Sequence, residues 1–229
     1  GKEVTKVTEQ LGKEPKFVVS PSGIKSRYTD KETSEIFTMV MSGRINKAIV
    51  QMLQKNGINA IGLSGMDGKT IEANRKKKLM IMNEKGRKQM IDGGYTGKIS
   101  NVNSELIKTI MDKGYTPVIS PIAISEESEF LNVDGDRAAA NVAGYVKSDK
   151  VLFITNVDGL LMEEKVVEKL SLQEAKEIMP KIGFGMEKKI LAATEALEMG
   201  VSEALIANGQ KENPISSAIA HDNCTVITK

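Results

Sequence analysis

The sequence predicts an α/β protein, a three-layer α-β-α sandwich with an open, mostly parallel central sheet and a β-hairpin insertion. Two observations predict this class. Short apolar runs alternate with helical patterns along most of the 229 residues. The runs contain few polar residues, which is typical of strands buried on both faces of a parallel sheet. Loops rich in Gly, Asp and Asn follow several runs directly, so we expect ligands at the carboxyl ends of the strands.

The elements are predicted in order along the chain. Residues 2–11 form the first helix, and strands are expected at 17–20, 60–64, 117–120, 151–155, 204–207 and 225–228. The clearest helix covers 31–55, capped by Thr29 or Asp30 and ended by Asn56-Gly57. Its apolar stripe is Ile36, Phe37, Val40, Met41, Ile45, Ala48, Ile49, Met52 and Leu53. Further helices are expected at 104–113, 137–146, 172–178 and 186–199.

One segment departs from the alternation. Residues 77–82 and 87–91 flank a turn at 83–86, which predicts a β-hairpin. Basic residues lie in or beside it at Arg75, Lys76, Lys77, Lys78, Lys85, Arg87 and Lys88. On its own this pattern indicates a solvated, solubilising surface, because exposed charges contribute little stability.

Composition excludes several classes of function. A net charge of +2 and 4% aromatic residues indicate neither a general affinity for nucleic acid nor a base-stacking surface. The single His221 excludes a histidine-rich metal site, and we expect no metal ligated by the protein itself. The single Cys224 excludes an internal disulfide and suits a reducing compartment. With no membrane span of about 18 apolar residues and no signal peptide, a cytoplasmic protein is expected.

Two loops before helices contain candidate site residues. In NVDGD at 132–136, Asp136 either caps the next helix or orients lysines around a metal-bound phosphate. In GFGMEKK at 183–189, Lys188 and Lys189 fall in the first turn of a helix. Cations there oppose the helix dipole at roughly 0.3–1 kcal/mol each, and a bound polyphosphate reverses that sign. Solvated lysines explain this pattern equally well.

Three further segments leave both a structural and a functional interpretation open. GLSGMDGKT at 62–70 has Leu63 where a P-loop needs glycine, so it is either a tight turn or a ligand loop. TNVDG at 155–159 either holds a nucleotide or turns the chain. Arg27 either binds a substrate carboxylate with two hydrogen bonds or pairs with Asp30 at the surface.

Together the motifs resemble the amino acid kinase family, especially its acetylglutamate kinase branch. The matching segments, in family order, are GIKSRYTD at 23–30, GRINK at 43–47, GLSGMDG at 62–68, NVDGD at 132–136, TNVDG at 155–159 and GMEKK at 185–189. Within that branch, SRYTD at 26–30 and GYTGK at 94–98 are similar to archaeal lysine-biosynthesis enzymes. Those enzymes use ATP to phosphorylate the side-chain carboxylate of aminoadipate, some also of glutamate, bound to a small acidic LysW-like carrier protein. The resemblance therefore implies an alternative for the basic hairpin, a surface that steers such an acidic carrier.

The resemblance implies a role for each matched residue. Arg27 binds the substrate carboxylate, Gly1 lies beside the substrate, and Asn132 holds its main chain or amide. Asp136 organises lysines around the transferring phosphoryl group, and Lys189 stabilises its charge in the transition state. The residues expected around ATP are Thr155, Asn156, Asp158, Gly159, Gly185, Met186 and Lys188. Magnesium is also expected, held largely by the phosphates.

The resemblance also implies a substrate-binding lobe at 1–148, an ATP-binding lobe at 149–229, and a homodimer formed through the first lobe. The family opens with a strand, a lysine and a glycine loop whose last glycine matches Gly1, so we expect the full protein to include that segment. Two alternatives stay open: an N-acetylglutamate kinase acting on the free substrate in arginine biosynthesis, and a non-catalytic nucleotide-binding sensor of the same fold. Aminoadipate and glutamate differ by one methylene, which the sequence does not resolve.

Overall fold

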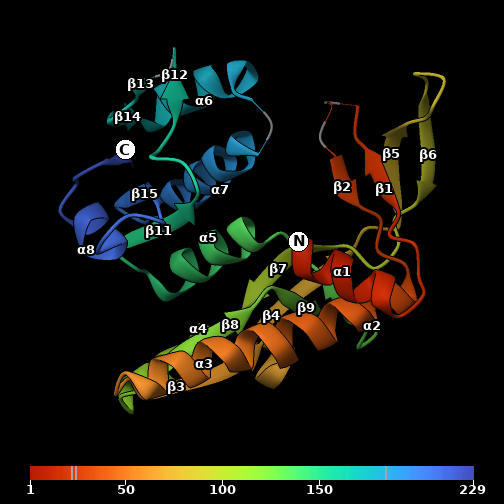
Figure 1. Cartoon of the computed structure of the whole chain (residues 1–229), viewed down its shortest axis with the longest axis horizontal. Coiled ribbons are helices and arrows are strands. Elements are labelled where there is room, and N and C mark those ends of the chain that lie inside the picture. Colours follow the sequence, from red (N-terminus) through yellow and green to blue (C-terminus); the bar gives the residue numbers. More distant parts are fainter. Residues whose placement is uncertain (22, 24, 164, 184) are drawn as a thin grey trace. The chain divides into compact units, whose positions relative to one another are not determined.

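The computed structural model describes residues 1–21, 23, 25–163, 165–183 and 185–229. In these residues the chain forms two compact units, Gly1–Gly135 (unit 1) and Asp136–Lys229 (unit 2). Each unit combines strands with helices that pack on them, which confirms the predicted α/β class (Figure 1). Ile24 and Phe184, which belong to two of the predicted motifs, lie outside the described residues. No helix in the described ranges is both long enough and apolar enough to cross a membrane.

Unit 1 consists of helices and short strands, with four strands in succession over residues 71–102. In chain order they are α1 Lys2–Gln10, β1 Phe17–Val19, β2 Lys25–Arg27, α2 Lys31–Thr38, a π-helical segment Met39–Ile45, α3 Asn46–Lys55, β3 Ala60–Ser64, a 3-10 turn Asp67–Lys69, β4 Ile71–Arg75, β5 Lys78–Met82, β6 Lys88–Asp92, β7 Gly97–Val102, α4 Ser104–Asp112, β8 Thr116–Ser120, β9 Ile122–Ile124 and β10 Phe130–Asn132.

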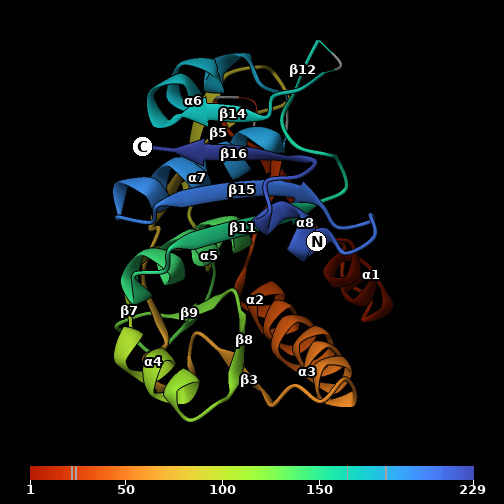
Figure 2. The ribbon, with the colours of Figure 1, turned by 90° about the vertical axis from the view of Figure 1, so that its left-hand side faces the viewer.

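Unit 1 contains both parallel and antiparallel pairing. Strands β3 and β8 are parallel, as predicted, and α3 packs against both of them (Figure 2). A second sheet has the order β10-β9-β4-β7, and a third has the order β2-β1-β5-β6. The predicted hairpin is confirmed as β5 and β6, which pair antiparallel from Lys78↔Asp92 to Met82↔Lys88.

The predicted strand at 17–20 forms as β1, but its predicted burial in a parallel sheet is wrong. Strand β1 pairs antiparallel with β2 and with β5 of the hairpin. Phe17 is 46% exposed. A run of three apolar residues therefore does not distinguish a core strand from a strand with one face open to solvent.

The helix predicted over 31–55 forms, but a π-helical segment, Met39–Ile45, interrupts it. The Asp30 side chain accepts a hydrogen bond from the Thr33 amide (2.8 Å) and caps the start. Asn56 ends the helix, and Gly57 follows at φ 78°. Both predicted helix ends are confirmed.

The second half of the predicted apolar stripe is not buried. Ile49 is 37% exposed and Met52 60% exposed, and Ala48 is also exposed. Asn46 is buried instead, because its amide donates to the Val118 carbonyl of β8 (2.7 Å) and to that of Leu63 in β3 (3.2 Å). A polar side chain thus joins this helix to the two parallel strands.

Unit 2 is a four-stranded sheet with helices on both faces. Its elements are α5 Gly135–Val146, β11 Lys150–Thr155, β12 Leu161–Met162, β13 Lys165–Val166, β14 Lys169–Ser171, α6 Leu172–Ile178, a 3-10 turn Met179–Lys181, α7 Met186–Glu198, β15 Glu203–Asn208, α8 Pro214–Ile219 and β16 Cys224–Thr228. The strand order is β11-β15-β16-β14. The main apolar core includes residues of α5, α6 and α7, and a smaller core on the sheet includes Ala218 of α8.

Two details of unit 2 depart from the sequence-based expectation. Strand β16, predicted within a mostly parallel sheet, runs antiparallel to β15, because the segment containing α8 returns the chain to Cys224, opposite Ala207. The compact units divide at 135/136, whereas the predicted lobes divide at 148/149. Ala140 and Ala143 of α5 lie in the same core as Phe153, which places this helix in unit 2.

Candidate functional site

The candidate residues of unit 1 begin with Arg27, at the end of β2. Its Nη2 donates to the Gly1 carbonyl (3.0 Å) and to Thr5 Oγ1 (2.6 Å) in α1. Its guanidinium lies over the Phe17 ring, 5.2 Å from the centroid. In the described part of the chain Arg27 forms no ion pair with Asp30, which caps α2 and pairs with Lys13 at 3.0 Å. The structure thus brings Gly1 and Arg27 together.

The Arg27 guanidinium retains an unused donor. Its Nη1 is buried and has no hydrogen-bond partner among the described residues. Burial lowers the pKa of Arg27, since desolvation disfavours its charged form. A buried donor without a partner is costly, and an anionic ligand removes that cost. A carboxylate is the kind of group that would satisfy this donor.

Three motifs that are far apart in the sequence meet near Asn132. The Tyr95 amide donates to the Thr29 carbonyl (2.6 Å), and the Asn132 amide donates to the Tyr95 carbonyl (2.9 Å). Asn132 Nδ2 donates to Thr29 Oγ1 (3.0 Å). Gly94 has φ 60°, and a Cβ there would lie 2.3 Å from the Thr29 carbonyl oxygen. Within the described residues no hydrogen bond joins Asn132 to Arg27 directly, and Thr29 is the link between their segments.

Arg75 anchors the same loop, a role that the sequence did not suggest. Its Nε donates to the Gly94 carbonyl (2.8 Å), and its guanidinium stacks on Tyr95 at 4.1 Å from the ring centroid. Its Nη1 pairs with Glu129 Oε1 at 2.8 Å. In the sequence Arg75 was one more basic residue beside the hairpin. Only the fold places it against the loop.

The 62–70 segment forms a turn, not a P-loop. Asp67 Oδ2 accepts from the Ser64 amide (2.6 Å) and from Ser64 Oγ (2.9 Å). Gly68 has φ 56°. These bonds close the exit from β3, so the tight-turn interpretation accounts for the aspartate and the glycine.

In unit 2 the ammonium of Lys189 lies 2.9 Å from both carboxylate oxygens of Asp136. Asp136 is in the first turn of α5 and Lys189 is in the first turn of α7. The lysine side chain is 18% exposed and the aspartate 26%. The two contacts hold the Lys189 ammonium in one position, so Asp136 orients this lysine.

A second ion pair connects the same two helices. Arg137 Nε and Nη2 donate to the two carboxylate oxygens of Glu195, at 2.9 and 2.6 Å. A two-point arginine–carboxylate contact is directionally specific and therefore aligns α5 with α7. The sequence analysis did not identify either residue, because nothing local links positions 58 residues apart.

The 155–159 loop follows β11 and contacts the loop after β15. Asp158 Oδ1 accepts from Asn208 Nδ2 (2.8 Å), and Asp158 pairs with Lys211 (2.8 Å). These hydrogen bonds, the one from Lys211 first, lower the pKa of Asp158. Thr155 Oγ1 lies 3.4 Å from Asn156 Oδ1. The bend therefore has a defined structure without a ligand.

Gly159 has a packing reason to be glycine. It has φ 153°, and a Cβ would lie 2.5 Å from Thr225 Oγ1. That hydroxyl accepts a hydrogen bond from the Leu160 amide (2.8 Å). The close approach of Gly159 to Thr225 fixes the position at which the chain leaves the 155–159 loop.

The residues at the start of α7 divide between core and surface. Gly185, at φ 94°, precedes the helix, and no described residue outside its two chain neighbours lies within 4 Å of an added Cβ. Met186 packs against the main core of unit 2. Lys188 is half-buried and forms no ion pair with any described residue. The helix start thus presents a glycine and an unpaired cation.

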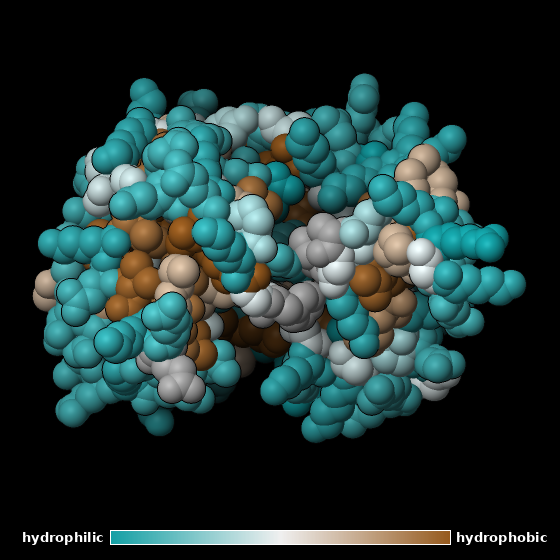
Figure 3. Space-filling model, turned by 90° about the horizontal axis from the view of Figure 1, so that it is seen from above, coloured by the Kyte–Doolittle hydropathy of each residue, from teal (hydrophilic) through white to brown (hydrophobic). Residues whose placement is uncertain are grey.

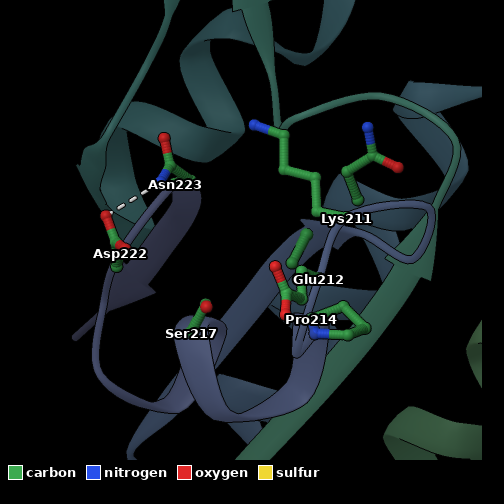
Figure 4. Close-up of a pocket in the computed structure, with 8 residues that line it drawn as sticks. Lys211, Glu212, Pro214, Ser217, Asp222 and Asn223 are labelled. Atoms are coloured by element: carbon green, nitrogen blue, oxygen red, sulfur yellow. Dashed lines mark hydrogen bonds between the residues drawn. The ribbon is translucent and has the colours of Figure 1, made fainter.

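A pocket of about 370 Å³ lies beside the carboxyl end of β15 (Figure 4). Its lining residues are Ala207, Asn208, Lys211, Glu212, Pro214, Ser217, Asp222 and Asn223. Two of them, Asn208 and Lys211, contact Asp158. The sequence did not indicate this pocket, because its lining residues form no recognisable motif.

Comparison with known proteins identifies the family of this chain. The family model described as "Amino acid kinase family" matches residues 1–208. A Nitrosopumilus maritimus protein, provisionally named a [LysW]-aminoadipate/[LysW]-glutamate kinase, is 84% identical over 227 residues, covering 99% of this chain and 85% of the relative. The kinase of that name from Metallosphaera sedula is 50% identical over 221 residues, covering 96% and 84%.

Solved structures show a similar fold. Protein smu.665 of Streptococcus mutans aligns with a TM-score of 0.78 at 22% identity, covering 100% of this chain and 82% of that one. N-acetylglutamate synthase of Neisseria gonorrhoeae aligns with a TM-score of 0.79 at 21% identity, covering 100% and 50%. At these identities the likeness concerns the fold alone.

Proposed function

Because this chain belongs to the amino acid kinase family, we propose that it phosphorylates an amino acid bound to a carrier protein. The γ-phosphoryl group of ATP passes to the side-chain carboxylate of aminoadipate or glutamate, whose amino group is joined to a LysW-type carrier. The products are an acyl phosphate and ADP. The high identity to the relatives of that name supports this substrate class over other carboxylates.

The observation that carries the choice of a carboxylate substrate is the buried, unbonded Nη1 of Arg27. Its other terminal nitrogen is already held by Gly1 and Thr5, so the guanidinium is oriented before substrate arrives. A preorganised arginine loses little side-chain freedom on binding. Asn132, held by Thr29, is available to the amide that links substrate and carrier.

Lys189 supplies the positive charge for phosphoryl transfer. The transferring group carries its charge on three oxygens, so catalysis consists mostly of positioning and neutralisation. Asp136 holds the Lys189 ammonium through both carboxylate oxygens. The Arg137–Glu195 pair aligns the two helices that bear these residues.

The start of α7 fits a polyphosphate. Among the described residues, no atom lies within 4 Å of a Cβ added at Gly185 and Lys188 has no ion-pair partner, and a helix amino terminus favours anions. The 155–159 loop and the β15 pocket offer polar groups for the rest of the nucleotide. Magnesium, held mainly by the phosphates, supplies charge neutralisation when bound.

The basic hairpin steers the acidic carrier toward the enzyme. Charged residues around β5 and β6 raise the encounter rate with an acidic protein.

Apolar side chains on the long helix join two copies of the chain. Met39, Ile49 and Met52 are each more than a third exposed on this helix. Exposed apolar side chains on one helix suit a homodimer interface. Analytical ultracentrifugation of Met52→Glu tests it, and an unchanged dimer contradicts it.

One assay separates the candidate functions. The purified enzyme is given ATP with carrier-linked aminoadipate, carrier-linked glutamate or free N-acetylglutamate, and the acyl phosphate is trapped as a hydroxamate. Turnover of the carrier-linked substrates alone supports the proposal. Equal turnover of free N-acetylglutamate points to an N-acetylglutamate kinase. ATP binding without any acyl phosphate points to a nucleotide sensor.

A further inference from the structure

Thr29 connects two segments that the proposed function assigns to the substrate. It follows Arg27 closely in the chain, and its hydroxyl oxygen accepts a hydrogen bond from Asn132 Nδ2 at 3.0 Å. Figure 3 shows apolar atoms among long hydrophilic side chains on its right-hand side, the side on which β2 lies in Figure 1. Thr29, just beyond β2, is by contrast 0% exposed. Its hydrogen bond to Asn132 is therefore made inside the protein and not at the solvated surface.

The backbone on both sides of the Thr29 hydroxyl is fixed. The Tyr95 amide donates to the Thr29 carbonyl at 2.6 Å. The next residue, Asp30, accepts from the Thr33 amide at 2.8 Å and pairs with Lys13 at 3.0 Å. A β-branched side chain such as threonine also has few accessible rotamers. The hydroxyl of Thr29 is therefore an acceptor in a fixed position.

The Asn132 side chain depends on that acceptor. The backbone of Asn132 is held separately, since its amide donates to the Tyr95 carbonyl at 2.9 Å and β10 pairs with β9. The contact with Thr29 is the one hydrogen bond that its side chain makes within the described ranges. The two ends of an asparagine amide are alike in size but differ in polarity, so packing alone does not decide which end faces outward. With Nδ2 held by Thr29, the acceptor Oδ1 is the end left for a ligand.

We propose that Thr29 is a positioning residue for the carrier-linked substrate. Its hydroxyl holds Asn132 Nδ2, so that Oδ1 accepts a hydrogen bond from the N–H of the amide that joins the substrate to the carrier. This inference rests on the proposed function and deepens it. Arg27 offers a donor to a carboxylate while Asn132 offers an acceptor to an N–H, and an N-acylated amino acid carries both groups. A site with such fixed polar groups rejects a ligand that lacks the matching group.

The first test compares two substitutions of Thr29 by steady-state kinetics. Thr29→Val replaces the hydroxyl by a methyl group of similar size, and Thr29→Ser keeps a hydroxyl. We expect Thr29→Val to raise KM for carrier-linked glutamate about tenfold, with Thr29→Ser within about threefold of wild type and the KM of ATP unchanged in both. Thr8→Val is the matched control, because Thr8 is also 0% exposed and its hydroxyl donates to the Val4 carbonyl of its own helix at 2.7 Å.

The second test asks whether Thr29 acts through Asn132. In an Asn132→Ala background there is no side-chain amide to hold, so Thr29→Val should change KM by less than about twofold. A further readout uses carrier joined to 2-hydroxyglutarate through an ester, which has no N–H. The wild-type enzyme should prefer the amide-linked substrate to this ester, and Thr29→Val should lose most of that preference.

Each alternative outcome has a distinct meaning. An unchanged KM for carrier-linked glutamate in Thr29→Val overturns the positioning role while the proposed function stands. A full effect of Thr29→Val in the Asn132→Ala background also overturns it, because Thr29 then acts by another route. Equal effects of Thr29→Ser or Thr8→Val overturn it as a general disturbance of the fold.

Two controls keep these outcomes separate. If Thr29→Val does not fold, Thr29→Ala removes the same hydroxyl without adding atoms, and the same comparison with Thr29→Ser decides the result. A wild-type enzyme that phosphorylates no carrier-linked substrate overturns the proposed function and this positioning role together.

Discussion

Replacing Lys189 with methionine removes one positive charge and keeps the length and apolar stem of the side chain. In the folded protein the ammonium lies 2.9 Å from both oxygens of Asp136 and is 18% exposed. The variant therefore leaves a carboxylate that is 26% exposed without this cation. It also removes the charge proposed to act on the phosphoryl group.

The two effects have different sizes. Removing a preorganised electrostatic group from a transition state costs about 2.7–4 kcal/mol, or about 10²–10³ in kcat. Leaving the partly buried carboxylate without this cation costs about 1–3 kcal/mol of the free energy of unfolding. Since the ATP loops are otherwise intact, the Kd of ATP changes little. The variant should be folded, able to bind ATP and nearly inactive.

The assay measures kcat by hydroxamate trapping, the Kd of ATP by calorimetry and unfolding by urea. Lys176→Met is the matched control, because its partner Glu198 also lies on α7 and both side chains are more exposed. That variant should keep its kcat and lose less than about 1 kcal/mol of stability. If Lys189→Met keeps kcat within about threefold of wild type but loses stability, the lysine is structural and the catalytic assignment is wrong.

Three further predictions concern other parts of the chain. Arg27→Lys should raise KM for the carboxylate substrate about 10- to 100-fold in steady-state assays, because lysine lacks the planar guanidinium that Gly1 and Thr5 orient through Nη2 and that leaves Nη1 without a partner among the described residues; an unchanged KM argues against Arg27 as the carboxylate ligand. Gly94→Ala should destabilise unit 1 by about 1–3 kcal/mol more than Gly86→Ala in urea unfolding. Both glycines have positive φ, but only the Cβ at position 94 meets a backbone carbonyl, at 2.3 Å; equal losses contradict this. Hydrogen bonds, the one from Lys150 first and then one from the histidine, lower the pKa of Glu203 below 4.5. Its stabilisation is therefore present above pH 4.5 and lost as the pH falls through the lowered pKa. Glu203→Gln should cost about 1–2 kcal/mol at pH 7 and nothing in acid, and a pH-independent cost contradicts the sign.

Local pattern was sufficient to predict most elements. Helix periodicity, capping residues and turn residues act within a few positions, so the helix ends at Asp30 and Gly57 and the hairpin at 78–92 were predictable. Asp136 and Lys189 were predictable as candidates, because each lies in a motif just before or within the first turn of a helix. The motifs could not indicate how close these two side chains lie in the folded chain.

The tertiary structure decided which separated residues meet and which apolar surfaces stay open. The Lys189–Asp136 pair, the Arg137–Glu195 pair and the contact of Arg75 with the Gly94 loop join positions 53, 58 and 19 residues apart. The exposure of β1, the buried Asn46 and the antiparallel β16 likewise depend on which element lies alongside. Burial and hydrogen bonding are properties of neighbours in space, and a single chain's pattern records only neighbours in sequence.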